Sequence, residues 1–274
     1  MSIDDRILIL TRILIVNNQR LRDYILAEPL FTTGFLSLLK RAERVMVSTG
    51  AGISTESGIP PFRGQDGLWE KFKPEELATP EAFDRDPKKV WEWYDWRRQM
   101  IRKAEPNSGH LALVAMEELI PRFFLFTQNI DGLHQRAGSK TVRELHGNIW
   151  RVRCMKEKNK IFETLETPFR EIPPRCDCGS LVRPDVVWFG EPLPSDILTT
   201  SRDVAANCDF FFVIGSSATV EPAASLAWLA RERGAVVVEI NDEITPVTEI
   251  ANECFLGKSG VILPQLLDAL RNHA

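Results

Sequence analysis

The sequence has little cysteine, with five in 274 residues, and that number is odd. No secretory signal is predicted, because the first apolar run follows the acidic residues Asp4 and Asp5 and no small-residue cleavage site comes after it. A disulfide framework is therefore not expected. These absences favour a reducing compartment, and we expect a cytoplasmic protein.

Long hydrophobic runs are also missing. The N-terminal run at residues 7–16, ILILTRILIV, is interrupted by Thr11 and Arg12. It is shorter than the roughly 20 residues that a membrane-spanning helix needs, so we predict no membrane segment. The run is predicted to form an amphipathic helix, followed by a second helix near Leu36 to Ala42 that leads into the first strand.

An excess of basic charge is absent as well. The formal net charge is -4, which argues against a general nucleic-acid binder but leaves basic protein substrates open. Hydrophobic residues make up 44% of the chain and charged residues 26%, as in soluble globular domains. No internal repeat or low-complexity stretch occurs. The length suits one large domain, or one domain with an inserted subdomain, and we expect a monomer.

The chain is organised around residues 44–69, RVMVSTGAGISTESGIPPFRGQDGLW. The first five of these residues are largely apolar and end close to a glycine, so they predict a short buried strand. Gly50, Gly52 and Gly58 allow close backbone approach, so that successive N–H groups can face an anion. A strand that feeds such a turn predicts a phosphate cradle.

The glycine spacing departs from the usual dinucleotide-binding pattern, because Thr55 stands where the third glycine belongs. The spacing alone therefore leaves an ordinary tight turn as the alternative. Residues 54–64 add a long polar loop that is stiffened by two prolines and carries one aromatic residue and one arginine. A loop of this length can fold over a ligand as a lid.

Apolar segments elsewhere in the chain are also predicted to be strands, and each one leads into a polar or glycine-bearing segment. They are residues 123–126, 142–145, 210–214 and 236–240. In an open parallel sheet the carboxyl ends of the strands gather at one edge, where ligands bind. The pattern predicts an α/β fold with a Rossmann-type doubly wound parallel sheet.

Insertions into this sheet are predicted to form a small subdomain. One, at about residues 68–108, is helical and rich in aromatic residues, with helix starts at Thr79 and Asp86, each of which precedes a proline. The other, at about residues 150–184, bears cysteines and contains a charged surface segment at 156–174. The predicted limits are an N-terminal helical extension at 1–35 and a main domain at 36–274.

Three motifs resemble those of the sirtuins, the NAD-dependent protein lysine deacylases. They are GAGISTESGIPPFRG at residues 50–64, TQNIDGLH at 127–134 and GSSATVEP at 215–222. The resemblance implies that NAD is consumed and that nicotinamide, free lysine and O-acyl-ADP-ribose are released. It implies the following NAD-binding residues: Gly50, Ala51, Gly52, Ile53, Glu56, Ser57, Pro60, Phe62, Arg63, Trp69, Gln128, Asn129, Asp131, Gly215, Ser216, Ser217, Asn241 and Ser259.

The resemblance assigns catalysis to Asn129, Asp131 and His146. Oriented carboxamide and carboxylate groups, as Asn129 and Asp131 would supply, can stabilise the positive charge that develops when the bond to nicotinamide breaks. His146, which precedes Gly147, matches the family's base, because a neutral imidazole can accept a proton from a ribose hydroxyl. The alternatives are a polar loop that caps a helix and a structural histidine.

A segment that follows the second insertion resembles the family's substrate-binding strand. An extended stretch of this kind can pair with a substrate peptide by adding a strand, and the alternative is a core strand. Its residues are Val186, Val187, Trp188, Phe189 and Gly190.

Tyr94 and Arg97 predict the substrate class. They lie three residues apart, so on a helix they share a face. An arginine fork suits a carboxylate, and a tyrosine hydroxyl can add a second donor. The pair resembles the Y-x-x-R pair of sirtuins that remove malonyl, succinyl or glutaryl groups, and Ala78 resembles the small residue that leaves room for a longer acyl chain. The alternative is an incidental pair on a surface helix.

The metal site departs from the sirtuin pattern of two C-x-x-C pairs that hold a structural zinc. Glu157 stands where the second thiol belongs, and the other pair is compressed around Asp177. Either carboxylate could be a fourth ligand, and a lost or partial site is the alternative. Cys208 and Cys254 are expected to be buried in the sheet domain. The predicted zinc ligands are Cys154, Cys176 and Cys178.

We interpret the sequence as a deacylase that favours succinyl and malonyl groups on protein lysines, extends to glutaryl groups and deacetylates more weakly. No nucleic acid or membrane partner is expected. A plain deacetylase is the nearest alternative. Tyr94 and Arg97 argue against a protein ADP-ribosyltransferase, and Asn129, Asp131 and His146 together argue against a non-catalytic NAD-sensing module.

Overall fold

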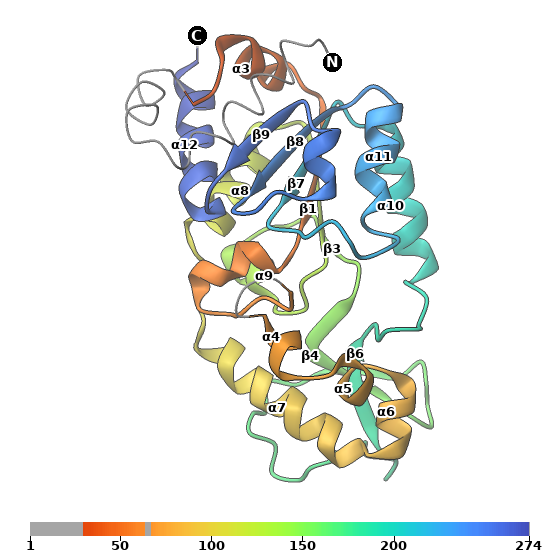
Figure 1. The fold of residues 1–274 in the computed structure, drawn as a ribbon. Coiled ribbons are helices and arrows are strands. Elements are labelled where there is room, and N and C mark those ends of the chain that lie inside the picture. The colour runs from red at the N-terminus through yellow and green to blue at the C-terminus, as the bar shows by residue number, and fades with distance from the viewer. Residues whose placement is uncertain (1–29, 64–66, 274) are drawn as a thin grey trace.

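The computed structural model describes residues 30–63 and 67–273. Its larger sheet has six parallel strands in the order β3-β2-β1-β7-β8-β9 (Figure 1). The chain order reverses between β1 and β7, which makes this the switch point of a doubly wound sheet and confirms the predicted fold class. The strands are β1 (Arg44–Thr49), β2 (Arg122–Thr127), β3 (Val142–Glu144), β7 (Phe210–Ile214), β8 (Val236–Asn241) and β9 (Glu253–Leu256).

Helices cover both faces of this sheet (Figure 1). Val45 and Val47 of β1 belong to a core shared with α3, α8 and α12, whereas Met46 belongs to a core shared with α10 and α11. Because successive strand side chains point to opposite faces, a strand that is apolar at every position indicates burial on both sides. These helices are α3 (Thr33–Lys40), α8 (Ser108–Leu119), α10 (Ser195–Asn207), α11 (Ser225–Glu232) and α12 (Ser259–Asn272).

A smaller subdomain joins a three-stranded antiparallel sheet, in the order β5-β4-β6, to short helices and the long α7. The predicted helix starts are confirmed, since Thr79 Oγ1 accepts a hydrogen bond from Ala82 N and Asp86 Oδ1 accepts one from Lys89 N. The elements are α4 (Leu68–Lys71), α5 (Pro74–Leu77), α6 (Pro80–Arg85), α7 (Pro87–Lys103), β4 (Gly147–Cys154), β5 (Ile161–Glu163) and β6 (Val182–Val186).

Some local predictions need correction. The first residues of the expected loop at 54–64 belong to the 3-10 helix η2 (Ala51–Ser57), because the turn closes hydrogen bonds back on itself. Cys254 is half-buried, whereas Cys208 is buried as predicted. The segment at 156–174 is mostly exposed, as predicted, and contains β5. The remaining elements are α9 (Leu133–Ala137) and η3 (Pro246–Glu249).

The helix predicted at residues 7–16 lies outside the described residues, and the division into 1–35 and 36–274 stays a prediction. The second predicted helix is confirmed as α3. No helix in the described part of the chain is long and apolar enough to span a membrane.

Candidate functional site

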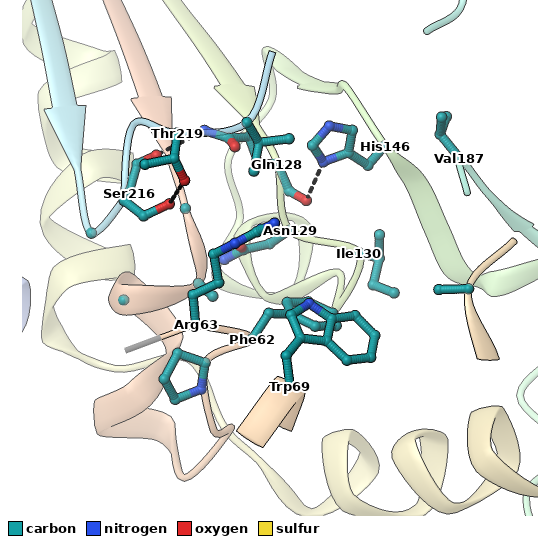
Figure 2. Close-up of a pocket in the computed structure, with 18 of the residues that line it drawn as sticks. Phe62, Arg63, Trp69, Gln128, Asn129, Ile130, His146, Val187, Ser216 and Thr219 are labelled. Carbon is teal, nitrogen blue, oxygen red and sulfur yellow. Dashed lines mark hydrogen bonds between the residues drawn. The ribbon is translucent and has the colours of Figure 1, made fainter. Parts of the chain in front are cut away.

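A cavity of about 1250 Å³ lies at the carboxyl edge of the parallel sheet, where it meets the small subdomain (Figure 2). Ligands of open α/β sheets bind at this place. Most of the predicted residues line it: Gly50, Ala51, Gly52, Glu56, Pro60, Phe62, Arg63, Trp69, Ala78, Tyr94, Gln128, Asn129, His146, Val186, Val187, Trp188, Phe189, Gly190, Gly215, Ser216, Ser217 and Asn241.

Five predicted residues do not line the cavity. Ile53 belongs to the sheet core, and Ser259 is buried at the start of α12. Asp131 and Arg97 are buried under lining residues, and Ser57 Oγ accepts a hydrogen bond from the residue that caps α8. These side chains can shape the site, but they do not form its surface.

Other lining residues were not predicted. Ile130 and Thr219 line the cavity and fall inside two of the motifs, so the motifs could have identified them. Residues 242–246 follow β8, and the rule that strand ends gather at one edge could have identified them too. Arg202 of α10 and Lys258 also line the cavity, yet no local signal marks them.

The glycines hold two strand ends in close contact. Gly50 N donates to Ile214 O at 2.9 Å, and Gly52 N donates to Gly215 O at 2.8 Å. A Cβ atom on Gly52 would lie 2.7 Å from Gly215 Cα, and one on Gly215 would lie 2.4 Å from a backbone nitrogen of η2. Thr55, in place of the third glycine, donates from its hydroxyl to the Gly52 carbonyl. Gly52 and Gly215 are therefore required because the two backbone segments pack too closely for a side chain at either position.

Asn129 and Asp131 converge on Ser54. The Ser54 hydroxyl donates to Asp131 Oδ2 at 2.8 Å, and Asn129 Nδ2 donates to Ser54 Oγ at 3.2 Å. Burial raises the pKa of Asp131, while hydrogen bonds from Leu133 N and Ser54 oppose this change. The three side chains form one buried polar unit, in which Asn129 faces the cavity (Figure 2).

His146 faces the same cavity from the end of β3 (Figure 2). Its Nδ1 lies 3.0 Å from the Gln128 carbonyl oxygen. Because a carbonyl only accepts, Nδ1 carries the proton, and in the neutral ring Nε2 is left as a proton acceptor. Burial lowers the pKa of His146, although the hydrogen bond to Gln128 opposes this shift. The ring is therefore neutral near pH 7 and suited to act as a base.

Tyr94 and Arg97 are 3% and 2% exposed, so the alternative of an incidental surface pair is wrong. Arg97 lies over the rings of Phe62, at 4.3 Å, and Trp93, at 5.4 Å, both of which line the cavity. Among the described residues, neither its Nε nor its Nη1 has a hydrogen-bond partner. Burial lowers the pKa of Arg97 to about 10, so the guanidinium remains charged at neutral pH without a bound anion.

A model of the Sir2 family matches residues 50–222. The chain belongs to the Sir2 family. It is 58% identical to the NAD-dependent protein deacylase of Aquifex aeolicus (strain VF5) over 228 residues, which are 83% of this chain and 95% of that protein.

Solved Sir2 structures share the fold. A Sir2 homolog–NAD complex superimposes with a TM-score of 0.83 at 45% identity, covering 88% of this chain and 94% of that one. A Sir2 complex with a deacetylated p53 peptide and 3'-O-acetyl ADP-ribose superimposes with a TM-score of 0.79 at 34% identity, covering 88% and 98%. The family is therefore shown by sequence and by fold.

The cysteine cluster of this Sir2 chain lies in the small subdomain, away from the cavity. Cys154 ends β4, and its Sγ is 3.5 Å from Cys178 Sγ. Cys176 joins them, and the three sulfur atoms lie within 4.8 Å of one another. In the described part of the chain neither Glu157 nor Asp177 belongs to this group. Cysteine sulfur atoms are donors that zinc prefers, so the residues present can supply three ligands to a zinc ion.

Proposed function

We propose that this Sir2 chain is an NAD-dependent protein lysine deacylase that favours acidic acyl groups, succinyl and malonyl first and glutaryl as well, with weaker deacetylation. The observation that carries the acyl preference is the buried guanidinium of Arg97, beside the cavity that also holds His146. Its Nε and Nη1 have no hydrogen-bond partner in the part of the chain that the structure describes. The Aquifex aeolicus relative, named as a deacylase, supports the reaction class.

The acid preference follows from the cost of leaving a buried cation without a partner. A carboxylate at the end of the acyl chain would supply the acceptors that Arg97 lacks, and such charge-assisted hydrogen bonds are stronger than neutral ones. Tyr94 can add a donor, because burial raises its pKa to about 12 and keeps the hydroxyl protonated. The Phe62 ring covers the guanidinium, so an acyl group that reaches Arg97 displaces this ring.

The catalytic roles rest on the geometry of the cavity wall. His146 Nε2 accepts a proton from a ribose hydroxyl, which becomes the nucleophile that takes over the acyl group. Asn129 and Asp131, held by Ser54, stabilise the charge that develops as nicotinamide leaves. As nicotinamide leaves, the acyl oxygen bonds to the ribose carbon. The deprotonated hydroxyl then adds to the acyl carbon, lysine leaves as the amine and one water molecule is consumed, which gives nicotinamide, free lysine and O-acyl-ADP-ribose.

The substrate peptide and the metal occupy other parts of the small subdomain. Residues 186–190 continue past the end of β6, and a substrate backbone can add to them as a strand. Cys154, Cys176 and Cys178 would hold a zinc ion, which ties the end of β4 to the loop before β6 and has no part in the chemistry.

The test measures nicotinamide release and peptide mass for matched succinyl-lysine and acetyl-lysine peptides with NAD. The native chain is expected to have a higher kcat/KM for succinyl-lysine, and Arg97→Met is expected to lower the succinyl-to-acetyl ratio at least tenfold, since each 1.4 kcal/mol lost is a factor of ten. Arg102→Met is the matched control, because Arg102 is an exposed arginine on the same helix.

His146→Ala is expected to abolish turnover of both peptides. Faster acetyl than succinyl turnover, with a ratio that does not depend on Arg97, would contradict the acid preference and leave a plain deacetylase.

A further inference from the structure

Tyr94 receives a hydrogen bond from a residue in the segment that follows β6. Trp188 Nε1 lies 2.9 Å from the Tyr94 hydroxyl oxygen, and both side chains are buried, at 3% exposure each. An indole N–H can only donate, so the tyrosine oxygen accepts this bond and cannot direct its own proton toward Trp188. The hydroxyl proton is thus left for another acceptor.

We infer that Trp188 is a specificity-determining positioning residue, which orients the Tyr94 hydroxyl so that its proton, together with Arg97, meets the carboxylate of an acidic acyl group. This inference rests on the proposed function. It adds a role for the Trp188 side chain that is separate from the pairing of the backbone at 186–190 with a peptide.

Trp188 is itself held rigidly. The Arg183 guanidinium lies 3.4 Å from the centroid of a Trp188 ring. Arg183 in turn donates to both carboxylate oxygens of Glu191, at 2.6 and 2.8 Å, and Glu191 Oε2 accepts the Trp188 backbone N–H at 2.9 Å. The Phe83 ring packs against the indole from α6, with ring centroids 5.3 Å apart. The indole N–H is therefore fixed in direction before any substrate arrives.

The fixed donor matters because a hydroxyl group can rotate. Without the indole N–H, the Tyr94 oxygen can turn a lone pair toward an incoming carboxylate, which repels it. With the indole N–H in place, one lone pair is occupied and the proton is available to the carboxylate. A preorganised donor stabilises the bound acid without the cost of reorientation, whereas an acetyl group gains nothing from it.

The experiment is a double-mutant cycle with Trp188→Phe, Tyr94→Phe and the double variant, comparing kcat/KM for succinyl-lysine and acetyl-lysine peptides. The acetyl peptide corrects for effects on the peptide strand and on NAD that both substrates share. Each single variant is expected to lower the succinyl-to-acetyl ratio about five- to tenfold, mainly through KM for the succinyl peptide. The double variant is expected to be no worse than Tyr94→Phe, because Trp188 acts through the tyrosine hydroxyl.

Two results would overturn the inference: an unchanged ratio in Trp188→Phe, or a double variant whose loss equals the product of the two single losses. If Trp188→Phe does not fold, Glu191→Gln replaces it in the cycle, because this change weakens the contacts of Arg183 and Glu191 that hold Trp188 and keeps the indole. If the effects of Glu191→Gln and Tyr94→Phe on the ratio are then independent, the inference is overturned.

Arg97→Met distinguishes failure of the proposed function from failure of this inference. A ratio that ignores Arg97 contradicts the proposed function, whereas sensitivity to Arg97 with independent Trp188 and Tyr94 effects contradicts this inference alone.

Discussion

Burial has different consequences for two titratable groups at the site. It lowers the pKa of His146, which favours the neutral ring that can accept a proton. It lowers the pKa of Arg97 to about 10, which is still far above neutral pH, so the guanidinium stays charged. The same desolvation therefore favours the neutral form of His146 and leaves Arg97 as a buried cation.

The lowered pKa of His146 predicts how kcat/KM for deacylation falls at acidic pH. Because the charged imidazolium is disfavoured, the base stays unprotonated to a lower pH than an ordinary histidine, whose pKa is 6.5. The kcat/KM for deacylation is expected to be nearly constant from about pH 7 to pH 8 and to fall only below about pH 6.5. Measured profiles in which the acid limb has its midpoint above pH 6.5 would argue against this environment for His146.

At the scale of elements, the contact between the end of β1 and the end of β7 decides the shape of the cavity. The two segments meet backbone to backbone at Gly52 and Gly215, with no space for a side chain. Interiors are packed closely enough that one added methyl group must move its neighbours. The glycine loop after β1 thus takes its position from β7 as well as from its own turn.

Gly52→Ala is expected to lower the free energy of unfolding by about 2 kcal/mol and to weaken NAD binding, because the new Cβ atom forces the two strand ends apart. Gly34→Ala is the control, since no atom lies within 4 Å of its added Cβ atom and alanine favours the helix α3. Urea unfolding and NAD titration measure both effects. Equal stability of the two variants would show that the segments separate without cost.

At the scale of the whole molecule, a buried polar column joins α8 and α9 to the sheet. His110 and His134 are 0% and 1% exposed, and their ring centroids lie 4.8 Å apart. His134 Nε2 is 2.9 Å from Thr49 Oγ1, whose hydroxyl donates to Thr127 Oγ1. Thr127 Oγ1 also accepts the backbone N–H of Asn129 at 3.0 Å. The column therefore runs from α8 to the segment that carries Asn129.

This column predicts a loss of stability in acid. Burial lowers the pKa of His110 to about 4 and that of His134 well below 6.5. Between these values and 6.5 the unfolded chain binds more protons than the folded chain, so the free energy of unfolding falls as the pH drops through this window. His110 is expected to account for about 1 kcal/mol of the loss between pH 7.5 and pH 5.5.

Urea unfolding at the two pH values, with the native chain and His110→Gln, tests this expectation. The variant is expected to be less stable at pH 7.5 and to show a smaller difference between the two pH values. An undiminished pH difference in the variant would mean that His110 does not contribute to it.

Many of the strands, helix starts and motifs were predictable because each depends on the pattern of a few consecutive residues. The strands at 123–126 and 210–214, the helix starts at Thr79 and Asp86, and the Sir2 motifs follow from local pattern, and the structure and the family match confirm them. The loop at 54–64 was predicted less well, because its first residues form the 3-10 helix η2. The hydrogen bonds of this helix could not be predicted from the residue types.

The sequence by itself determined a doubly wound sheet, the family and a set of residues at one edge of the sheet, because periodicity and motif spacing are local properties. The tertiary structure alone decided which of them share an environment. Within the described residues, Arg97 Nε and Nη1 have no hydrogen-bond partner, and the guanidinium lies over the Phe62 ring. Trp188 contacts Tyr94, from which it is separated by 94 positions in the chain. Such contacts depend on how whole elements pack, so neighbouring residues in the sequence carry no signal for them.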